Sequence, residues 1–155
     1  MMKFFLFILI LVSSIANANE FKYLQSESYW TVRPAVFVCS DTNINIDLVK
    51  EAIKFWIDNG FNIDPNPSYK DCDRPISFGQ ITIDYFEEGD NPKNLNGRTR
   101  EWSYIGKNEL LEVEIKIKPS LENEIDLIKH ELGHALGLDD DRTGKAVVMR
   151  HARNY

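Results

Sequence analysis

The feature that most constrains this chain is the pentapeptide His130-Glu131-Leu132-Gly133-His134. On an α-helix, residues four apart are neighbours on the surface, so a helix here would present both imidazoles on one face. Zinc binds such a pair at about 2.0–2.1 Å from each nitrogen and needs at least one further protein ligand. The carboxylate between the histidines lies beside them, where a base that takes a proton from metal-activated water must sit. The pentapeptide therefore predicts the active-site helix of a zinc peptidase.

The residues around the pentapeptide indicate a helix with one buried side. Apolar residues recur at steps of three and four, at Leu121, Ile125, Ile128, Leu132 and Ala135. We expect Ser120, after Pro119, to cap the start of this helix, and Gly137 to end it in a left-handed conformation. The alternative is a surface helix that carries two histidines by chance. Against this alternative, two of the three histidines in the chain belong to the pentapeptide.

Two histidines leave a zinc ion short of a ligand, and a turn at Gly137 would return the chain toward the metal. The histidines, the glutamate and Gly137 have the register of the metzincin metallopeptidases, H-E-x-x-H-x-x-G-x-x-H, and the chain resembles that clan. Asp140 occupies the place of the third histidine, as in the snapalysin-like peptidases. The resemblance thus implies Asp140 as the third ligand, while spacing alone leaves Asp139 and Asp141 as alternatives.

The resemblance also implies an activity, that of a zinc-dependent endopeptidase. His130, His134 and Asp140 would hold one Zn²⁺, and Glu131 would act as the base. An aspartate neutralises more of the metal's charge than a histidine does, so the activated water should have a pKa above the value of about 7 found with neutral ligands. Met149 resembles the methionine turn that lies beneath the metal in this clan, although core packing would also account for a methionine after two valines.

His151 is a candidate for stabilising the transition state. It lies two residues after Met149, where astacin- and serralysin-type members of the clan carry a tyrosine. An imidazole there would donate a hydrogen bond to the oxyanion of the tetrahedral intermediate. The alternative is a solvated histidine between Arg150 and Arg153, which would leave Tyr155 as the nearby donor.

The first 18 residues have the pattern of a secretory signal peptide. Lys3 supplies the positive start, residues 4–12 the apolar run, and Ala16-Asn17-Ala18 a cleavage site of small residues. The apolar run is shorter than the roughly 20 residues that a membrane helix needs, which disfavours an uncleaved anchor. We therefore expect a secreted or periplasmic protein.

The chain without its leader is small and acidic. Removing 18 of the 155 residues leaves 137, the size of one domain, so residues 19–155 are expected to form a single catalytic domain. The leader removes one lysine from 18 basic residues, which leaves 17 against 24 acidic residues and a net charge of −7. This charge argues against nucleic acid and anionic lipid as partners. A protein or peptide substrate, no stable membrane association and a monomeric state are expected instead.

The chain has two cysteines, Cys39 and Cys72. An even number of cysteines in an exported chain is most simply explained by a disulfide bond. A role as metal ligands is the alternative, but the pair lacks the C-x-x-C clustering of most zinc–thiolate sites. The sequence therefore predicts a disulfide between a strand and a loop rich in proline and aspartate.

The remaining pattern predicts an α+β domain with a twisted mixed sheet and two main helices, the second of which carries the metal motif. Strands are expected over residues 31–40, 76–86, 99–105 and 111–118, with the last two forming a hairpin around residues 106–108; a first helix is expected over residues 46–59, and loops over residues 62–75 and 87–98. This order resembles the N-terminal half of a matrixin catalytic domain, and residues 49–56 resemble that family's first helix. The resemblance implies a zincin-like fold.

Two further expectations concern the segments before the metal helix. Residues 97–105 are a candidate edge strand, to which an extended peptide could add as a further strand. Glu87, Glu88 and Asp90 offer oxygen ligands for a Ca²⁺ ion, as loops of matrixin-type enzymes do, although a solvated turn is the favoured interpretation of these acids. An alternative to the enzyme is an exported zincin-fold metal-binding or effector module without turnover, against which the intact Glu131 argues.

Overall fold

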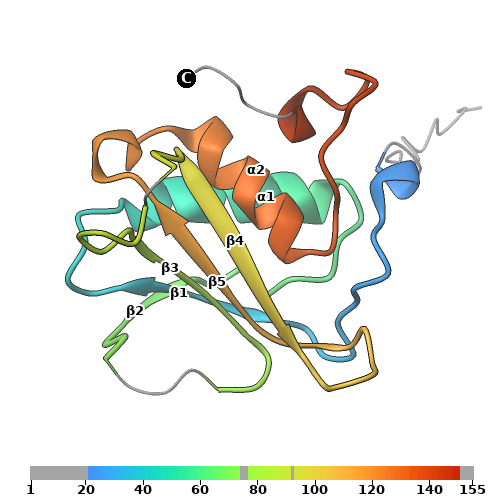
Figure 1. The fold of residues 1–155 in the computed structure, drawn as a ribbon, viewed down its shortest axis with the longest axis horizontal. Coiled ribbons are helices and arrows are strands. Elements are labelled where there is room, and N and C mark those ends of the chain that lie inside the picture. Colours follow the sequence, from blue (N-terminus) through green and yellow to red (C-terminus); the bar gives the residue numbers. More distant parts are fainter. Residues whose placement is uncertain (1–20, 74–76, 92, 151–155) are drawn as a thin grey trace, which may run out of the picture.

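The computed structural model describes residues 21–73, 77–91 and 93–150. Two helices, α1 (Ile46–Asp58) and α2 (Ile125–Ala135), lie against one face of a five-stranded sheet (Figure 1). Short 3-10 turns within the described residues are η1 (Lys22–Leu24), η2 (Pro119–Leu121) and η3 (Val147–Met149). The prediction of an α+β domain with a mixed sheet and two main helices is confirmed.

The sheet has the strand order β2-β1-β3-β5-β4. Its strands are β1 (Ala35–Cys39), β2 (Ser68–Lys70), β3 (Gln80–Tyr85), β4 (Gly97–Ser103) and β5 (Leu110–Ile117). The first three strands and β5 run parallel, whereas β4 pairs antiparallel with β5 in the predicted hairpin. β4 therefore forms one edge of the described sheet, and it lies beside α2 (Figure 1).

Successive side chains of the inner strands point to opposite faces of the sheet, one toward the core and the next away from it. Ile83 of β3 lies opposite Ile115 of β5, and both side chains are fully buried. Burying an isoleucine contributes about 1.5–3 kcal/mol to folding. The next pair along, Asp84 and Lys116, points to the other face. An ion pair of 2.7 Å between them compensates for burying the lysine.

Helix α1 begins at Ile46, as predicted, and ends at Asp58, one residue earlier than predicted. The Asn45 side chain accepts a hydrogen bond from the Asp47 amide at the start, and Gly60 adopts a positive φ of 89° just after the end. The buried side of the helix contains Trp56, whose indole Nε1 donates to the carbonyl of Lys129 in α2 at 2.9 Å. This contact joins the two helices.

The start of α2 was predicted wrongly. Ser120 does not cap the helix, because Pro119, Ser120 and Leu121 form the separate turn η2. The helix begins at Ile125, and its N-cap residue, Glu124, makes no side-chain capping bond. The expected end is confirmed, since Gly137 has a φ of 86°.

Strand β2 was also missed, because residues 62–75 were expected to form a loop. It has only three residues, and its parallel pairing with β1, such as Val38 opposite Tyr69, is the long-range contact that defines it. β1 and β3 are shorter than expected. Pro34 precedes β1, and Gly79, with a φ of 80°, precedes β3.

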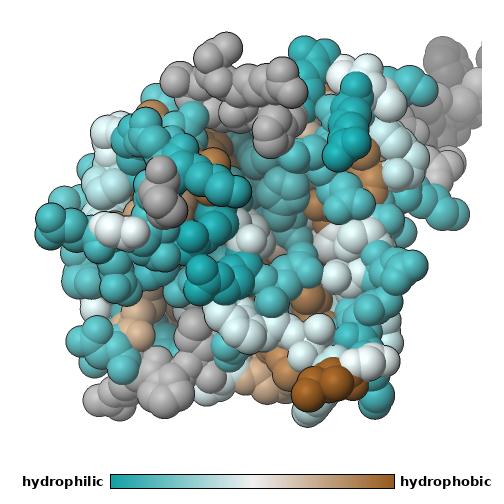
Figure 2. Space-filling view, in the orientation of Figure 1, coloured by the Kyte–Doolittle hydropathy of each residue, from teal (hydrophilic) through white to brown (hydrophobic). Residues whose placement is uncertain are grey.

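The predicted disulfide between Cys39 and Cys72 is confirmed, with 5.4 Å between the two Cα atoms. It connects the end of β1 to the segment that follows β2. No helix within residues 21–73, 77–91 and 93–150 is long and apolar enough to cross a membrane. Hydrophilic residues dominate the face drawn in Figure 2, with a hydrophobic area at the tip of the β4–β5 hairpin, where Ile105 is fully exposed.

Several predicted features lie outside the described residues. These are the leader with its cleavage site, His151 and Tyr155. In the loop predicted as a calcium candidate, the Asp90 carboxylate accepts a hydrogen bond from Arg98 at 2.7 Å. Arg98 also donates to the backbone carbonyl of Asp90, at 3.2 Å, and calcium binding stays an untested prediction.

Candidate metal centre

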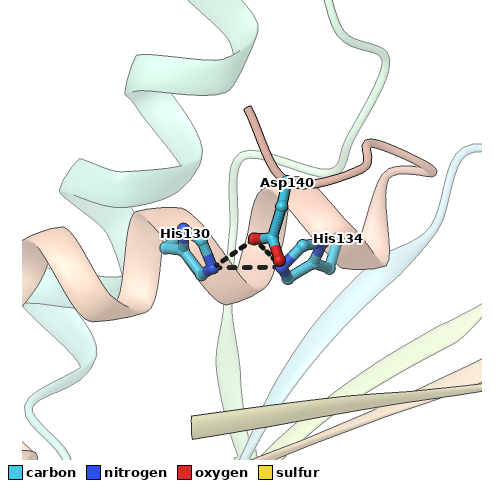
Figure 3. A group of neighbouring side chains, drawn as sticks. All are labelled: His130, His134 and Asp140. Atoms are coloured by element: carbon cyan, nitrogen blue, oxygen red, sulfur yellow. Dashed lines mark hydrogen bonds and ion pairs between the residues drawn. The ribbon is translucent and has the colours of Figure 1, made fainter. Parts of the chain in front are cut away.

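Helix α2 brings the two histidines of the pentapeptide to one place (Figure 3). His130 and His134 are one turn apart, and their Nε2 atoms lie 3.0 Å from each other. The left-handed Gly137 then reverses the chain, and Asp140 returns toward the helix. Its Oδ1 atom lies 3.4 Å from each Nε2 atom. The three side chains thus place two nitrogens and one carboxylate oxygen around a common point.

Hydrogen bonds on the far side of each imidazole set the tautomer. His130 Nδ1 lies 2.9 Å from the carbonyl oxygen of Val148, and His134 Nδ1 lies 2.7 Å from that of Leu138. A carbonyl oxygen only accepts hydrogen bonds, so each Nδ1 must carry the proton and donate it. In the neutral rings, both Nε2 lone pairs then face each other and Asp140. Such backbone acceptors behind histidine ligands are typical of metal sites.

The spacing of the three donor atoms fits a tetrahedral zinc ion. Ligand atoms about 2.0–2.1 Å from a tetrahedral metal lie about 3.3 Å apart. The triangle formed by the two Nε2 atoms and Asp140 Oδ1 has sides of 3.0, 3.4 and 3.4 Å. His130 is buried, while His134 and Asp140 are partly exposed, so one side of the triangle opens to the surface. The residues could therefore hold Zn²⁺ and leave a position for water or substrate.

The structure distinguishes the three consecutive aspartates that spacing left open. Asp140 joins the histidines, and Asp139 is exposed. Asp141 is buried, and its two carboxylate oxygens accept hydrogen bonds from the Thr143 hydroxyl and amide and from the Ala146 amide, at 2.6–2.7 Å. Burial alone would raise the pKa of Asp141, but these hydrogen bonds hold it well below its usual range. Asp141 thus shapes the loop after the site.

Glu131 is buried beside the two histidines and next to β4. Its Oε2 accepts a hydrogen bond from the hydroxyl of Thr99 at 2.7 Å. Gly97 leaves the space that the carboxylate needs, since a Cβ atom there would lie 2.7 Å from the Glu131 Cδ. Burial raises the pKa of Glu131 above its usual value, opposed by the Thr99 hydrogen bond and by His134, and Asp140 raises it further. A carboxyl group with a raised pKa is suited to exchanging protons.

Met149 lies beneath α2, close to the site. It ends the turn η3 and is fully buried, and its sulfur occupies the place where a side chain at Gly133 would be. The Met149 carbonyl accepts a hydrogen bond from the Asp141 amide at 2.6 Å. The His130 imidazole also bonds to the Val148 carbonyl, so the turn η3 contacts one of the two histidines as well as the residue that follows Asp140. Met149 is thus part of the hydrophobic core beside the site, and its role as a methionine turn stays a prediction.

Hydrogen bonds with residues 24–30, which precede β1, hold the end of α2 in place. The Ser26 amide donates to the Gly137 carbonyl, and the Asp139 amide donates to the Leu24 carbonyl, both at 2.8 Å. The Trp30 indole donates to the carbonyl of Ala135, also at 2.8 Å. The turn at Gly137 and the loop toward Asp140 are therefore held by residues more than a hundred positions earlier in the chain.

An open cleft of about 520 Å³ passes over the triangle. Its walls are formed by the N-terminal segment (Ser26 and Ser28, before β1), by β4, by α2 and by the loop after α2. Ser28 donates a hydrogen bond to Glu101 of β4 at 2.9 Å where these walls meet. The cleft also contains Leu95 and Leu127, so it offers both polar and apolar surface to a ligand.

No protein-family model matches the chain, and a search of curated proteins found no match either.

Sequence reasoning missed several residues of this site. Thr99 and Gly97 were recognised only as parts of a candidate edge strand, and neither Ser28 nor Trp30 was singled out. No local pattern could have identified their contacts, because each joins segments far apart in the sequence. The glycine at the start of a strand was the one available signal, since glycine there often marks a close approach of another group.

Proposed function

We propose that this protein is a zinc-dependent endopeptidase of the metzincin type with an aspartate as third ligand. The observation that carries the proposal is the triangle of His130 Nε2, His134 Nε2 and Asp140 Oδ1, whose sides match the edges of a zinc tetrahedron. The two imidazoles are already oriented by backbone carbonyls, and a buried glutamate lies beside them. This set is the one that hydrolysis by metal-activated water requires.

The chain's own residues would divide the chemistry as follows. Zinc, when bound, would supply a Lewis acid that lowers the pKa of water and polarises the scissile carbonyl. His130, His134 and Asp140 would hold the ion. Glu131 would accept the proton of the attacking water and pass it to the departing amine. The burial of Glu131 keeps bulk water from competing for that proton.

The substrate would be an extended peptide in the cleft. β4 is an edge strand of the described sheet, and Gly97, Thr99 and Glu101 line the cleft along it. Backbone groups on the outer edge of an antiparallel strand can pair with an added strand. A peptide bound there would run past the triangle, with its side chains contacting Leu95 and Leu127 or the rim near Ser28.

We also propose that the protein acts after export. The disulfide between Cys39 and Cys72 is compatible with an oxidising compartment, and the first 18 residues have the features of a cleaved signal peptide. Sequencing the N-terminus of the protein recovered outside the cytoplasm should find Asn19 as the first residue. An intact leader on the exported protein would contradict this part of the proposal.

The test of the activity uses purified protein from residue 19 onward, with zinc content measured beside hydrolysis of casein. The wild type should contain one zinc per chain and lose activity with a chelator. Glu131→Gln should retain zinc but lose turnover by a factor of about 10²–10⁴, because an amide cannot accept the proton. His134→Ala, as the comparison, should lose both zinc and activity.

The results separate the enzyme from its alternative. A wild type that binds zinc tightly but cleaves no protein or peptide would favour a metal-binding module without turnover. Near-normal hydrolysis by Glu131→Gln would show that Glu131 is not the base. Full zinc occupancy in His134→Ala would contradict the metal site itself.

A further inference from the structure

The carboxylate of Glu131 is held by a strand, although the residue itself belongs to a helix. Only 5% of Glu131 is exposed, yet it lines the cleft beside the two histidines. A buried carboxylate is costly unless it has a hydrogen-bond donor. The Thr99 hydroxyl of β4 supplies that donor at 2.7 Å from Oε2.

The hydroxyl of Thr99 has two acceptors within reach, both belonging to the same residue. Its Oγ1 lies 2.7 Å from the carboxylate and 3.1 Å from the backbone carbonyl of Glu131. A hydroxyl has one proton, and a bond to an ionised acceptor is both shorter and stronger. The shorter distance therefore identifies the carboxylate as the main acceptor.

Gly97 acts on the same carboxylate through the absence of a side chain. A Cβ atom at this position would lie 2.7 Å from Cδ and 2.9 Å from Cγ of Glu131, too close for real contacts. Gly97 and Thr99 are two apart on β4, so both face α2. The glycine leaves room for the carboxylate, and the threonine fixes its orientation.

We propose that Thr99 and Gly97 are positioning residues that hold the Glu131 carboxylate in the orientation required for proton transfer. The inference rests on the proposed function, because it assigns them a role in that reaction. It also gives β4 two roles in the reaction. The strand expected to pair with the substrate backbone would also hold the base, so one element would set the distance between base and scissile bond.

The first test compares Thr99→Val, which removes the hydroxyl and preserves the shape, with Thr99→Ser, which keeps the hydroxyl. In Thr99→Val, kcat should fall by about ten- to a hundredfold, since a displacement of about 1 Å costs on that order. KM should stay within about twofold and zinc should be retained, because the proposed zinc ligands and the backbone of β4, which would pair with the substrate, are unchanged. Thr99→Ser should recover most of kcat.

The matched control is Thr82→Val in β3. Thr82 is also a buried threonine of the sheet, but it does not line the cleft. This variant should keep the wild-type kcat. Gly97→Ala provides an independent test, because the added methyl group should displace the carboxylate. Its kcat should fall while its zinc content stays at one per chain.

A second measurement does not depend on activity. Urea unfolding of the zinc-free protein should show that Thr99→Val lowers the midpoint in the wild-type background and lowers it less in Glu131→Ala. Such non-additivity is the signature of two groups in direct contact. Additive effects would overturn the contact between Thr99 and Glu131.

The outcomes separate the two proposals. In an active enzyme, a wild-type kcat for Thr99→Val, or a Thr99→Ser variant as impaired as Thr99→Val, would overturn the positioning role and leave the proposed function intact. A fall in kcat for Thr82→Val as large as that for Thr99→Val would also overturn it, by showing a general effect of losing a buried hydroxyl. A wild type without peptidase activity would overturn the proposed function and the positioning role with it.

Discussion

At the scale of single residues, three consecutive aspartates have different environments. Asp139 is exposed, Asp140 faces the two histidines, and Asp141 is buried among backbone amides. Their order follows from the turn at Gly137, whose amide and carbonyl are both bonded and whose missing side chain allows the Ser28 carbonyl to approach. A Cβ atom at Gly137 would lie 2.5 Å from that oxygen. The turn therefore selects which carboxylate reaches the two histidines.

Replacing Asp140 by alanine should weaken zinc binding, because it removes one of three ligands. The loss of a partner that only supports a ligand costs about 10–100-fold in metal affinity, so the loss of the ligand should cost at least as much. Titration of the purified variants with zinc measures the dissociation constant. Asp139→Ala is the matched control, and it should bind zinc as the wild type does. The reverse result would assign the third ligand to Asp139.

Asp141→Asn should destabilise the fold in a manner that depends on pH. Hydrogen bonds from Thr143 and Ala146 hold the pKa of Asp141 below its usual value. A carboxylate with a lowered pKa in the folded state stabilises that state above its unfolded pKa of about 3.9, and this stabilisation is lost as the pH falls toward the folded value. In urea unfolding of the zinc-free proteins, the wild type should have a higher free energy of unfolding than the variant, and this difference should become smaller below about pH 5. A difference in the free energy of unfolding that grows as the pH falls would show that the folded state does not favour the ionised form of Asp141.

At the scale of elements, α2 is held from several directions. The Trp56 indole joins it to α1, Met149 packs beneath Gly133, and Trp30 binds the carbonyl of Ala135. The side of the helix with the two histidines faces the cleft instead. The core side of α2 is therefore packed, while the side with the two histidines stays accessible from the cleft.

The disulfide acts on elements away from the metal centre. Replacing both Cys39 and Cys72 by alanine should lower the free energy of unfolding by about 3–4 kcal/mol, because the bond closes a loop with a sequence separation of 33. Denaturant unfolding measures this loss. Zinc affinity should not change, since β1 and β2 lie at the side of the sheet opposite to β4. A variant that stays folded but no longer binds zinc would contradict this separation.

At the scale of the whole molecule, the candidate metal centre joins three distant parts of the chain. The N-terminal segment, β4 and the region from α2 to η3 all contribute to it or to its walls. The three candidate ligands lie within residues 130–140, but contacts from Leu24, Ser26 and Val148 hold them in place, so the unfolded chain has no equivalent site. Metal binding and global stability should therefore be linked.

Zinc should raise the free energy of unfolding of the entire domain. An ion present at about 1,000 times its dissociation constant adds about 4 kcal/mol when it binds only the folded state. Urea unfolding with added zinc and with a chelator measures the difference. His134→Ala should unfold at the same urea concentration under both conditions. A wild type whose midpoint does not respond to zinc would show that the three residues do not hold the ion.

The sequence by itself determined the features that depend on local spacing. The four-residue separation of the histidines places them on one side of a helix, and Gly137 ends that helix because it tolerates a positive φ. A helix was likewise predicted over residues 46–59, where α1 lies, and the predicted hairpin around residues 106–108 is formed by β4 and β5. The pairing of Cys39 with Cys72 followed from there being only two cysteines. Zinc binding and hydrolysis stay predictions from the same pattern.

Only the tertiary structure decided the features that depend on contacts between distant segments. Spacing could not choose among three adjacent aspartates, because the choice depends on how the loop after α2 packs against residues 24–28. It could not reveal β2, which is defined by its pairing with β1, or that α2 starts at Ile125 after a separate turn. Nor could it show that Thr99 and Gly97 contact Glu131, since 32 residues separate Thr99 from that carboxylate and the packing of β4 against α2 brings them together.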